Sequence, residues 1–248
     1  MENYVLITGA SSGIGRAIAV TLSKTYPLIL GGRNVERLEE TRAMCADSDK
    51  HIFWNFDLSD VENIYENLKA FIKEGNLKIG GFVHSAGITY QSTLNLSDIN
   101  FAHKLMDINF FSATEILKVL VTKKINGKNL KAVVFISSIA SIRGTRGESF
   151  YAASKGAIDS FARVMAVDLA PNVRVNTIQP GLIWTSMTKK LGERFNSLNK
   201  HCLLGECEVQ DVADTAEFLM SEKSRRITGQ NFVLDGGLTL SVPSPFDA

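Results

Sequence analysis

Three polar side chains in the middle of the chain are suited to proton transfer. Tyr151 and Lys155 are four residues apart, so on a helix they share one face, and Ser138 lies thirteen residues before the tyrosine. A tyrosine hydroxyl can deliver a proton to a carbonyl oxygen, but its ordinary pKa is about 10. A nearby ammonium is expected to lower that pKa toward working pH. A serine hydroxyl can hold the same oxygen beside the tyrosine.

Such a pair also occurs on many solvated helix faces, so it does not identify an enzyme by itself. Residues 8–15 read Thr-Gly-Ala-Ser-Ser-Gly-Ile-Gly and join a short apolar run to a helical pattern. Backbone N–H groups at a helix N-terminus bind phosphate groups, and glycine lets the backbone approach them closely. At the first strand–helix junction this turn indicates a dinucleotide site. The expected contacts are Gly9, Ser11, Ser12, Gly13, Ile14 and Gly15.

Arg33 follows the second apolar run, where the residue type distinguishes the two nicotinamide dinucleotides. An acidic residue there accepts hydrogen bonds from a free ribose 2′-hydroxyl, whereas an arginine can hold a 2′-phosphate. The sequence therefore predicts NADP(H), with an ordinary exposed arginine as the alternative. Asp57 and Leu58, after the third run, are expected beside the adenine, although Asp57 can equally cap the next helix.

Short apolar runs alternate with longer helical patterns along the chain. The expected strands cover 4–8, 28–30, 51–56, 81–84, 132–136, 173–178 and 232–234, and the expected helices cover 14–25, 34–46, 60–74, 98–124, 149–170 and 209–221. This alternation predicts an α/β fold: a single doubly wound, Rossmann-like domain over 1–248, with a seven-stranded parallel sheet and helices on both faces. Ser59 with Glu62 is expected to form a capping box, and Ser97-Asp98 to cap the long helix.

The composition restricts the class of protein. With 27 basic and 26 acidic residues, the net charge of +1 does not indicate binding to nucleic acid or an anionic membrane. No apolar stretch suits a membrane span, and the N-terminus lacks a signal-peptide pattern. The cysteines lack the spacing of a zinc site, and Cys202 and Cys207 are interpreted as reduced, half-buried thiols rather than a redox pair. A cytoplasmic protein without a metal is expected.

These features together make the chain resemble the short-chain dehydrogenase/reductase family over nearly its whole length. The motifs that carry the resemblance are Thr8–Gly15, Ser85-Ala86-Gly87, Asn109, Ser138, Tyr151, Lys155, Pro180-Gly181, Gly229 and Asp235-Gly236-Gly237. The resemblance implies an NADP-dependent oxidoreductase that moves a hydride between the cofactor and a carbonyl or alcohol. It implies that Asn109 joins Ser138, Tyr151 and Lys155 as a catalytic residue, holding a water of a proton relay. It also implies cofactor contacts at Ala86, Gly87, Tyr151, Lys155, Pro180, Gly181, Ile183 and Thr185.

Two positions depart from the family pattern. His84-Ser85 stands where Asn-Asn is usual, and the first asparagine mainly braces the neighbouring strand. His84 is therefore interpreted as a satisfied structural histidine rather than a catalytic base. Ser12 stands where many NADP-using members carry a basic residue, which leaves Arg33 without that second cation.

Residues 182–206 form a long connection that is expected to be a substrate lid, with a mere cover of the core as the alternative. Its apolar positions are Trp184, Met187, Leu191, Phe195, Leu198, Leu203 and Leu204, and its basic ones are Lys189, Lys190, Arg194 and Lys200. An apolar lid suits a hydrophobic or acyl substrate, and the basic residues could attract an acidic acyl carrier protein.

Within the family, the pattern resembles 3-oxoacyl-[acyl-carrier-protein] reductases of fatty acid biosynthesis. The expected reaction is therefore reduction of a 3-oxoacyl thioester. A dehydrogenase of a sugar, polyol or other small hydroxy compound is the alternative, and a non-catalytic dinucleotide-sensing protein is an alternative of another class. The resemblance further implies a homo-oligomer, a dimer or tetramer, built on the helices 98–124 and 149–170.

Overall fold

The computed structural model describes residues 3–185, 188–189 and 201–240. Its centre is a seven-stranded sheet in the order β3-β2-β1-β4-β5-β6-β7, in which every neighbouring pair of strands is parallel. The strands are β1 (Tyr4–Thr8), β2 (Leu28–Gly32), β3 (Ile52–Asn55), β4 (Ile79–His84), β5 (Ala132–Ile136), β6 (Arg174–Pro180) and β7 (Asn231–Leu234). The predicted doubly wound α/β fold is confirmed, and the strand ends differ from the expected ones by a few residues at most.

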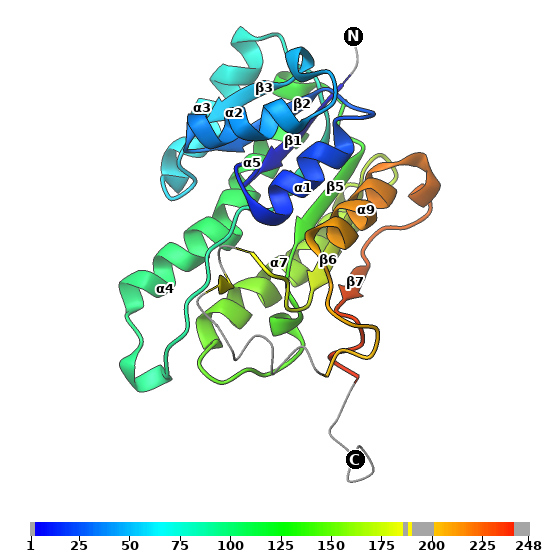
Figure 1. Cartoon of the computed structure of the whole chain (residues 1–248). Coiled ribbons are helices and arrows are strands. Elements are labelled where there is room, and N and C mark those ends of the chain that lie inside the picture. Colours follow the sequence, from blue (N-terminus) through cyan, green and yellow to red (C-terminus); the bar gives the residue numbers. More distant parts are fainter. Residues whose placement is uncertain (1–2, 186–187, 190–200, 241–248) are drawn as a thin grey trace.

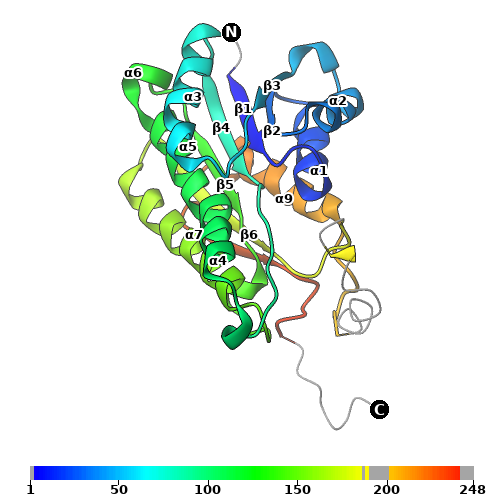
Figure 2. The same ribbon diagram turned by 90° about the vertical axis from the view of Figure 1, so that its left-hand side faces the viewer.

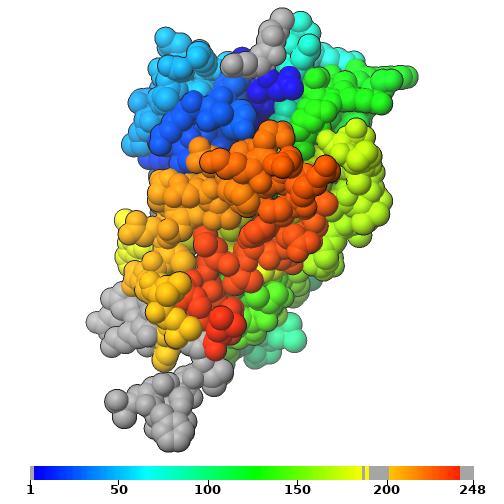
Figure 3. Space-filling model, turned by 90° about the vertical axis from the view of Figure 1, so that its right-hand side faces the viewer, coloured from blue at the N-terminus to red at the C-terminus, as the bar shows by residue number. Residues whose placement is uncertain are grey.

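Helices cover both faces of the sheet, as Figures 1 and 2 show. They are α1 (Gly13–Leu22), α2 (Val35–Met44), α3 (Val61–Glu74), α4 (Ile99–Met106), α5 (Ser112–Val121), α6 (Lys123–Asn126), α7 (Ser149–Asp168) and α9 (Val209–Met220). One apolar layer joins the sheet to α3, α5 and α7, and the other joins it to α1, α2 and α9. Figure 3 shows the second face, where α9 lies next to β7. Strands buried on both sides in this way need continuous apolar sequence, and all five residues of β5 are buried.

The direction of the strand order reverses between β1 and β4. From β1 the chain adds β2 and β3 on one side, and then returns to place β4 on the other side of β1. The loops after β1 and β4 therefore diverge and leave a crevice at the carboxyl ends of these strands. This is the expected position for a ligand in an open α/β sheet.

The long helix expected over 98–124 is interrupted. Residues Asp107–Phe111 form a π-helical turn between α4 and α5, and Asn109 lies within it. The Asn109 side chain bonds both the backbone N–H and the carbonyl of Ile88, at 2.8 and 3.0 Å. These long-range bonds accompany the local change of helix type, and π-turns are frequent at functional sites.

One helix cap is confirmed and one is wrong. Asp98 caps α4 by accepting a bond from the Asn100 N–H at 2.9 Å. The capping box of Ser59 and Glu62 does not form, because α3 begins after Asp60 without a side-chain cap. The Ser59 hydroxyl donates instead to the Asp57 carboxylate at 2.9 Å, so it is not available to the helix.

Most of the expected lid lies outside the described residues, including Met187, Lys190, Leu191, Arg194, Phe195, Leu198 and Lys200. At its described ends, Ile183 pairs with Cys207 as an isolated parallel bridge, and Leu203 and Leu204 are exposed. Cys202 and Cys207 are reduced and half-buried, as expected. Within the described ranges, no helix combines the length and the apolar character that crossing a membrane requires.

Candidate active site

The glycine-rich turn after β1 is built so that only glycine fits its two tightest points. Gly9 has φ +69°, and a Cβ there would lie 2.8 Å from the Ala86 backbone at the end of β4. A Cβ at Gly15 would collide with the Gly9 carbonyl oxygen. The N-cap of α1, Ser12, makes no side-chain cap bond, which leaves the first N–H groups of this helix available to an anion. The geometry fits a diphosphate approaching the turn.

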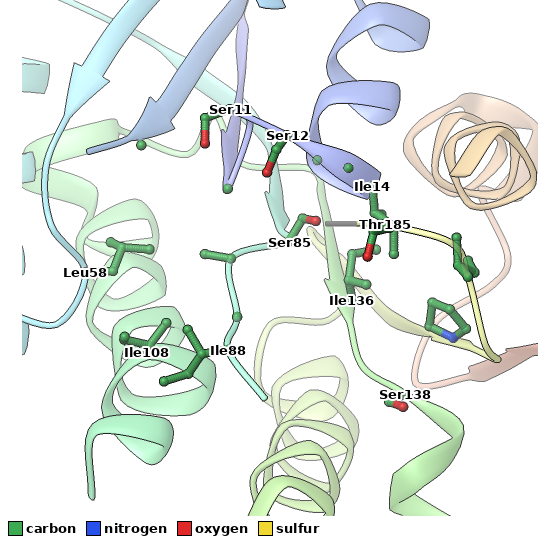
Figure 4. A pocket seen from close by; sticks show the side chains of 18 of the residues that line it. Ser11, Ser12, Ile14, Leu58, Ser85, Ile88, Ile108, Ile136, Ser138 and Thr185 are labelled. Carbon is green, nitrogen blue, oxygen red and sulfur yellow. The ribbon is translucent and has the colours of Figure 1, made fainter. Parts of the chain in front are cut away.

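A cavity of about 380 Å³ opens beside this turn, across the carboxyl ends of the central strands (Figure 4). All seventeen predicted cofactor contacts line it, namely Gly9, Ser11, Ser12, Gly13, Ile14, Gly15, Arg33, Asp57, Leu58, Ala86, Gly87, Tyr151, Lys155, Pro180, Gly181, Ile183 and Thr185. Ser138 lines it as well. Ten further lining residues were not among the predicted contacts, namely Gly32, Asn34, Arg37, Phe56, Ser85, Ile88, Ile108, Ile136, Ser137 and Thr188. Of these, Ser85 belongs to the Ser85-Ala86-Gly87 motif and Ser137 adjoins Ser138, and their positions after strands were the available signal.

The charges at one end of the cavity come from the loops after β2 and β3. Arg33 Nη1 lies 3.5 Å from Asp57 Oδ2, and both side chains are well exposed, at 71% and 48%. The pKa of Asp57 is below its usual range, chiefly because the Ser59 backbone N–H donates to it, with Arg33 adding a smaller effect. Arg37, one turn into α2, lines the same end. Two arginines therefore face this end, although Ser12 supplies no charge.

Ser138, Tyr151 and Lys155 meet at the opposite end of the cavity. Ser138 follows β5 and caps a short 3-10 turn by accepting a bond from the Ala140 N–H at 3.1 Å. Tyr151 and Lys155 lie on α7, and the lysine Nζ is 5.8 Å from the centre of the tyrosine ring. The ammonium donates to the Ile136 carbonyl at 2.9 Å, which ties α7 to the end of β5. The structure thus brings together the three residues that the sequence placed after a strand and on one helix face.

The expected direction of the tyrosine pKa is wrong for this structure. Desolvation raises the pKa of Tyr151 to about 12, and the nearby Ser138 hydroxyl only partly offsets it. Desolvation also lowers the pKa of Lys155 to about 8, opposed by the charge of Asp159. With these pKa values, both the Tyr151 phenol and the Lys155 amine are protonated at neutral pH. The tyrosine is therefore a proton donor, and the lysine is still mostly an ammonium.

Asn109 does not line the cavity. It is fully buried behind it, where its amide also donates to Ser154 Oγ at 3.0 Å, one residue before Lys155. Its other bonds hold the Ile88 backbone, and Ile88 forms part of the cavity wall. In this arrangement Asn109 links the π-turn, the loop after β4 and α7.

His84 is structural, as expected, but only one of its two ring nitrogens is well satisfied. The ring is buried at the end of β4, and Nδ1 bonds Thr8 Oγ1 of β1 at 2.9 Å. Nε2 makes no hydrogen bond of good geometry with any described residue. Burial lowers the pKa of His84 to about 3, so the ring is neutral at physiological pH. Like the usual asparagine, it braces two neighbouring strands.

The turn after β6 closes the third side of the cavity. Gly181 lies so close to Asp235 that a Cβ on Gly181 would be only 2.8 Å from the Asp235 backbone. Thr185 is held by Thr188, whose hydroxyl accepts from the Thr185 N–H at 2.8 Å and donates to the Ile183 carbonyl at 2.7 Å. Figure 4 shows Thr185 beside Ile14 at the start of α1. The turn after β6 and the glycine-rich turn after β1 therefore lie next to each other.

Comparisons with known proteins agree with this geometry. A model of the family described as "Enoyl-(Acyl carrier protein) reductase" matches residues 9–239. The chain is 33% identical to a 3-oxoacyl-[acyl-carrier-protein] reductase of Bos taurus, over 98% of this chain and 100% of that protein. Among solved structures it resembles a 4-hydroxyisoleucine dehydrogenase complexed with NADH, with a TM-score of 0.88, 27% identity, and coverage of 97% of this chain and 100% of that one.

It also resembles a gluconate 5-dehydrogenase of Burkholderia cenocepacia in complex with NADP and tartrate, with a TM-score of 0.88, 25% identity, and coverage of 97% of this chain and 96% of that one. A match of the family model over most of the chain, together with a full-length relative above 30% identity, identifies the family. The chain belongs to the short-chain dehydrogenase/reductase family of oxidoreductases.

Proposed function

We propose that the chain reduces the 3-oxo group of an acyl thioester with NADPH, using Asn109, Ser138, Tyr151 and Lys155. The observation that carries this proposal is the single cavity in which Ser138, Tyr151 and Lys155 face the same space as the glycine-rich turn and Pro180-Gly181. A carbonyl at that place has a proton donor, a hydrogen-bond donor and a cation around its oxygen.

The glycine-rich turn after β1 and Pro180-Gly181 would hold NADPH, which would supply a hydride, with its electron pair, to the carbonyl carbon. As the new C–H bond forms, the C=O π electrons move onto the oxygen. Ser138 holds this oxygen by a hydrogen bond, and Tyr151 transfers its phenolic proton to it, so that an alcohol O–H replaces the tyrosine O–H. The Lys155 ammonium stabilises the phenolate that remains, and Asn109 keeps the lysine's helix and the Ile88 segment in place.

The preference for NADPH rests on Arg33 and Arg37. Both line the cavity at the end opposite Tyr151, where a ribose 2′-phosphate would lie in an extended dinucleotide. Arginine donates two parallel hydrogen bonds to a phosphate. Because Asp57 lies 3.5 Å from Arg33, the arginine is already directed toward this end before any ligand binds.

The acyl substrate is supported by an apolar wall and by the name of a relative. Ile88, Ile108 and Ile136 line the cavity, and Trp184 is half-exposed after the Pro180-Gly181 turn. The relative from Bos taurus is named for a 3-oxoacyl substrate. A dehydrogenase of a small hydroxy compound is the second candidate, since two similar solved structures carry such names.

Turnover of acetoacetyl thioesters with NADPH tests the proposal, with gluconate and a panel of polyols and hydroxy amino acids as competitors. Tyr151→Phe is expected to lower kcat by at least about a hundredfold, since general acid catalysis contributes about that much, while the dissociation constant of NADPH stays within about twofold. Full activity of that variant would refute the role of Tyr151. Faster oxidation of a polyol than reduction of the thioester would favour the second candidate. Tight NADPH binding without any turnover would indicate a dinucleotide-sensing protein.

We further propose that the chain is a cytoplasmic homo-oligomer formed through α5 and α7. Val121 of α5 and Val164 and Val167 of α7 are exposed, and Gly156 of α7 has no neighbour within 4 Å of the place of its Cβ among the described residues. Exposed apolar side chains beside a small residue permit close helix packing. Light scattering should give a mass of a dimer or tetramer, and Val164→Glu should reduce it to that of the monomer.

A further inference from the structure

A buried polar chain behind the Tyr151–Lys155 face is not accounted for by the proposed reaction. It begins at Asp159, four residues after Lys155 on α7, which is only 4% exposed. A buried carboxylate is costly unless it is hydrogen-bonded or compensated by a cation. Asp159 Oδ2 accepts a bond from Gln179 Nε2 at 2.7 Å, while Oδ1 has no hydrogen-bond partner among the described residues.

Gln179 connects this carboxylate to the other walls of the site. It is 1% exposed at the end of β6, directly before Pro180 and Gly181. Its amide nitrogen also donates to Ser141 Oγ at 2.9 Å, and the Ser141 hydroxyl donates to the Ser138 carbonyl at 2.8 Å. An amide nitrogen carries two N–H groups, so one can serve the carboxylate and the other the serine.

The direction of every bond in this chain is determined by chemistry. An ionised carboxylate only accepts, so the nitrogen of Gln179 and not its oxygen must face Asp159. Ser141 uses its hydroxyl hydrogen on the Ser138 carbonyl, so it must accept from Gln179. One amide therefore joins α7, the turn after β6 and the turn after β5, which are the three elements that carry Lys155, Pro180-Gly181 and Ser138.

Asp159 also provides the charge that compensates the buried ammonium of Lys155. Among the residues that the structure describes, the other titratable groups near Lys155 are Tyr151 on the same helix and His84 at the end of β4. Both are neutral at pH 7, because the pKa of Tyr151 is about 12 and that of His84 is about 3. Asp159 is the group whose charge raises the pKa of Lys155 against desolvation.

We propose that Asp159 is a positioning residue for the reaction: through Gln179 and Ser141 it aligns the Ser138 and Pro180-Gly181 turns with α7, and its buried carboxylate, one helical turn after Lys155, is the counter-charge of the lysine. This inference rests on the proposed roles of Ser138 and Lys155, but on no particular substrate. It separates into an electrostatic part, which belongs to Asp159 alone, and a geometric part, which Ser141 shares.

Two variants separate these parts. Asp159→Asn removes the charge and keeps an oxygen that can accept from Gln179. Ser141→Ala keeps the charge and removes the bond to the Ser138 turn. Asp168→Asn, at the exposed end of the same helix, is the matched control. Each variant is assayed for kcat and KM between about pH 6 and 9, and the Lys155 ε-carbon signal is titrated by NMR, assigned with Lys155→Met.

In Asp159→Asn the midpoint of the Lys155 titration should move to lower pH by about one pH unit, because an opposite charge on the neighbouring helical turn is lost. At about pH 8 this leaves roughly one-fifth of the original ammonium, so kcat should fall about fivefold there and much less near pH 6.5. In Ser141→Ala, kcat should fall about tenfold at every pH without a shift of the midpoint, because a small displacement of a reacting group has that effect. KM should change little in either variant.

An unchanged Lys155 midpoint in folded Asp159→Asn would overturn the electrostatic part, and wild-type kcat in Ser141→Ala would overturn the geometric part. If Asp159→Asn does not fold, Ser141→Ala still decides whether the chain of bonds positions the site. The NMR titration needs no substrate, so it gives a result even if the wild type reduces no acyl thioester. A wild type that reduces no acyl thioester would refute the proposed function, whereas the Lys155 midpoint in Asp159→Asn would still support or overturn the electrostatic part.

Discussion

Replacing Arg33 by alanine should change which dinucleotide the protein prefers. The arginine lies at the end of β2 and is 71% exposed, so its ion pair with Asp57 adds little to stability and the fold should be retained. A hydrogen bond to a charged partner is worth about 1.5–3 kcal/mol, which corresponds to roughly a 10- to 150-fold change in a dissociation constant. Arg37 remains near the same end, so we expect the lower part of this range, about 10- to 30-fold, for NADPH.

NADH has no 2′-phosphate, so its dissociation constant should change by less than about twofold. The Asp57 carboxylate adds to the contrast, because without Arg33 it would repel a phosphate that approaches within a few ångström. Both constants can be measured by quenching of protein fluorescence or by calorimetry at a fixed salt concentration. Arg226→Ala, at an exposed arginine after α9, is the control. Equal weakening of NADPH and NADH binding, or none, would refute the assignment of Arg33 to the 2′-phosphate.

Two further predictions concern protonation. The rate of carbonyl reduction at saturating substrate should be constant below about pH 8 and should fall as pH rises through this value. The reason is that the pKa of Lys155 is about 8 and the reaction needs its ammonium form. A rate that increases up to about pH 10 would contradict this prediction. His84 has a folded-state pKa of about 3 against 6.5 for the ordinary side chain, so its contribution to stability is complete above about pH 6.5 and is lost as pH falls below it. Between about pH 6.5 and 5, the free energy of unfolding of the wild type should therefore fall by about 2 kcal/mol more than that of His84→Asn. Urea denaturation at the two pH values measures both losses, and equal losses in the two proteins would contradict the prediction.

The parts of the site that depend on neighbours in the sequence could be predicted from the sequence alone. The positive φ of Gly9 and the contact of Gly15 with the Gly9 carbonyl are features of the local turn, and the i,i+4 spacing of Tyr151 and Lys155 places both on one face of any helix. Alternating apolar runs determine a parallel sheet, and in such a sheet residues after the strands must converge at one edge. For this reason all the predicted cofactor contacts were found around one cavity.

The parts that depend on contacts between distant segments could not be predicted in this way. The π-turn at Asn109 coincides with bonds to Ile88, twenty-one positions earlier in the chain, which no helical periodicity encodes. The raised pKa of Tyr151 comes from desolvation, and the amount of water around a side chain is decided only when the elements pack.

The same reason applies to the residues that the sequence did not single out. Arg37 reads as an ordinary helix residue, and Asp159 and Gln179 read as polar residues in a helix and a strand. The packing of α7 against β6 buries a carboxylate and an amide that are twenty residues apart and brings them into hydrogen-bonding contact. Sequence pattern determines which residues can face the crevice, whereas tertiary packing decides their hydration and their partners, and hence their charge.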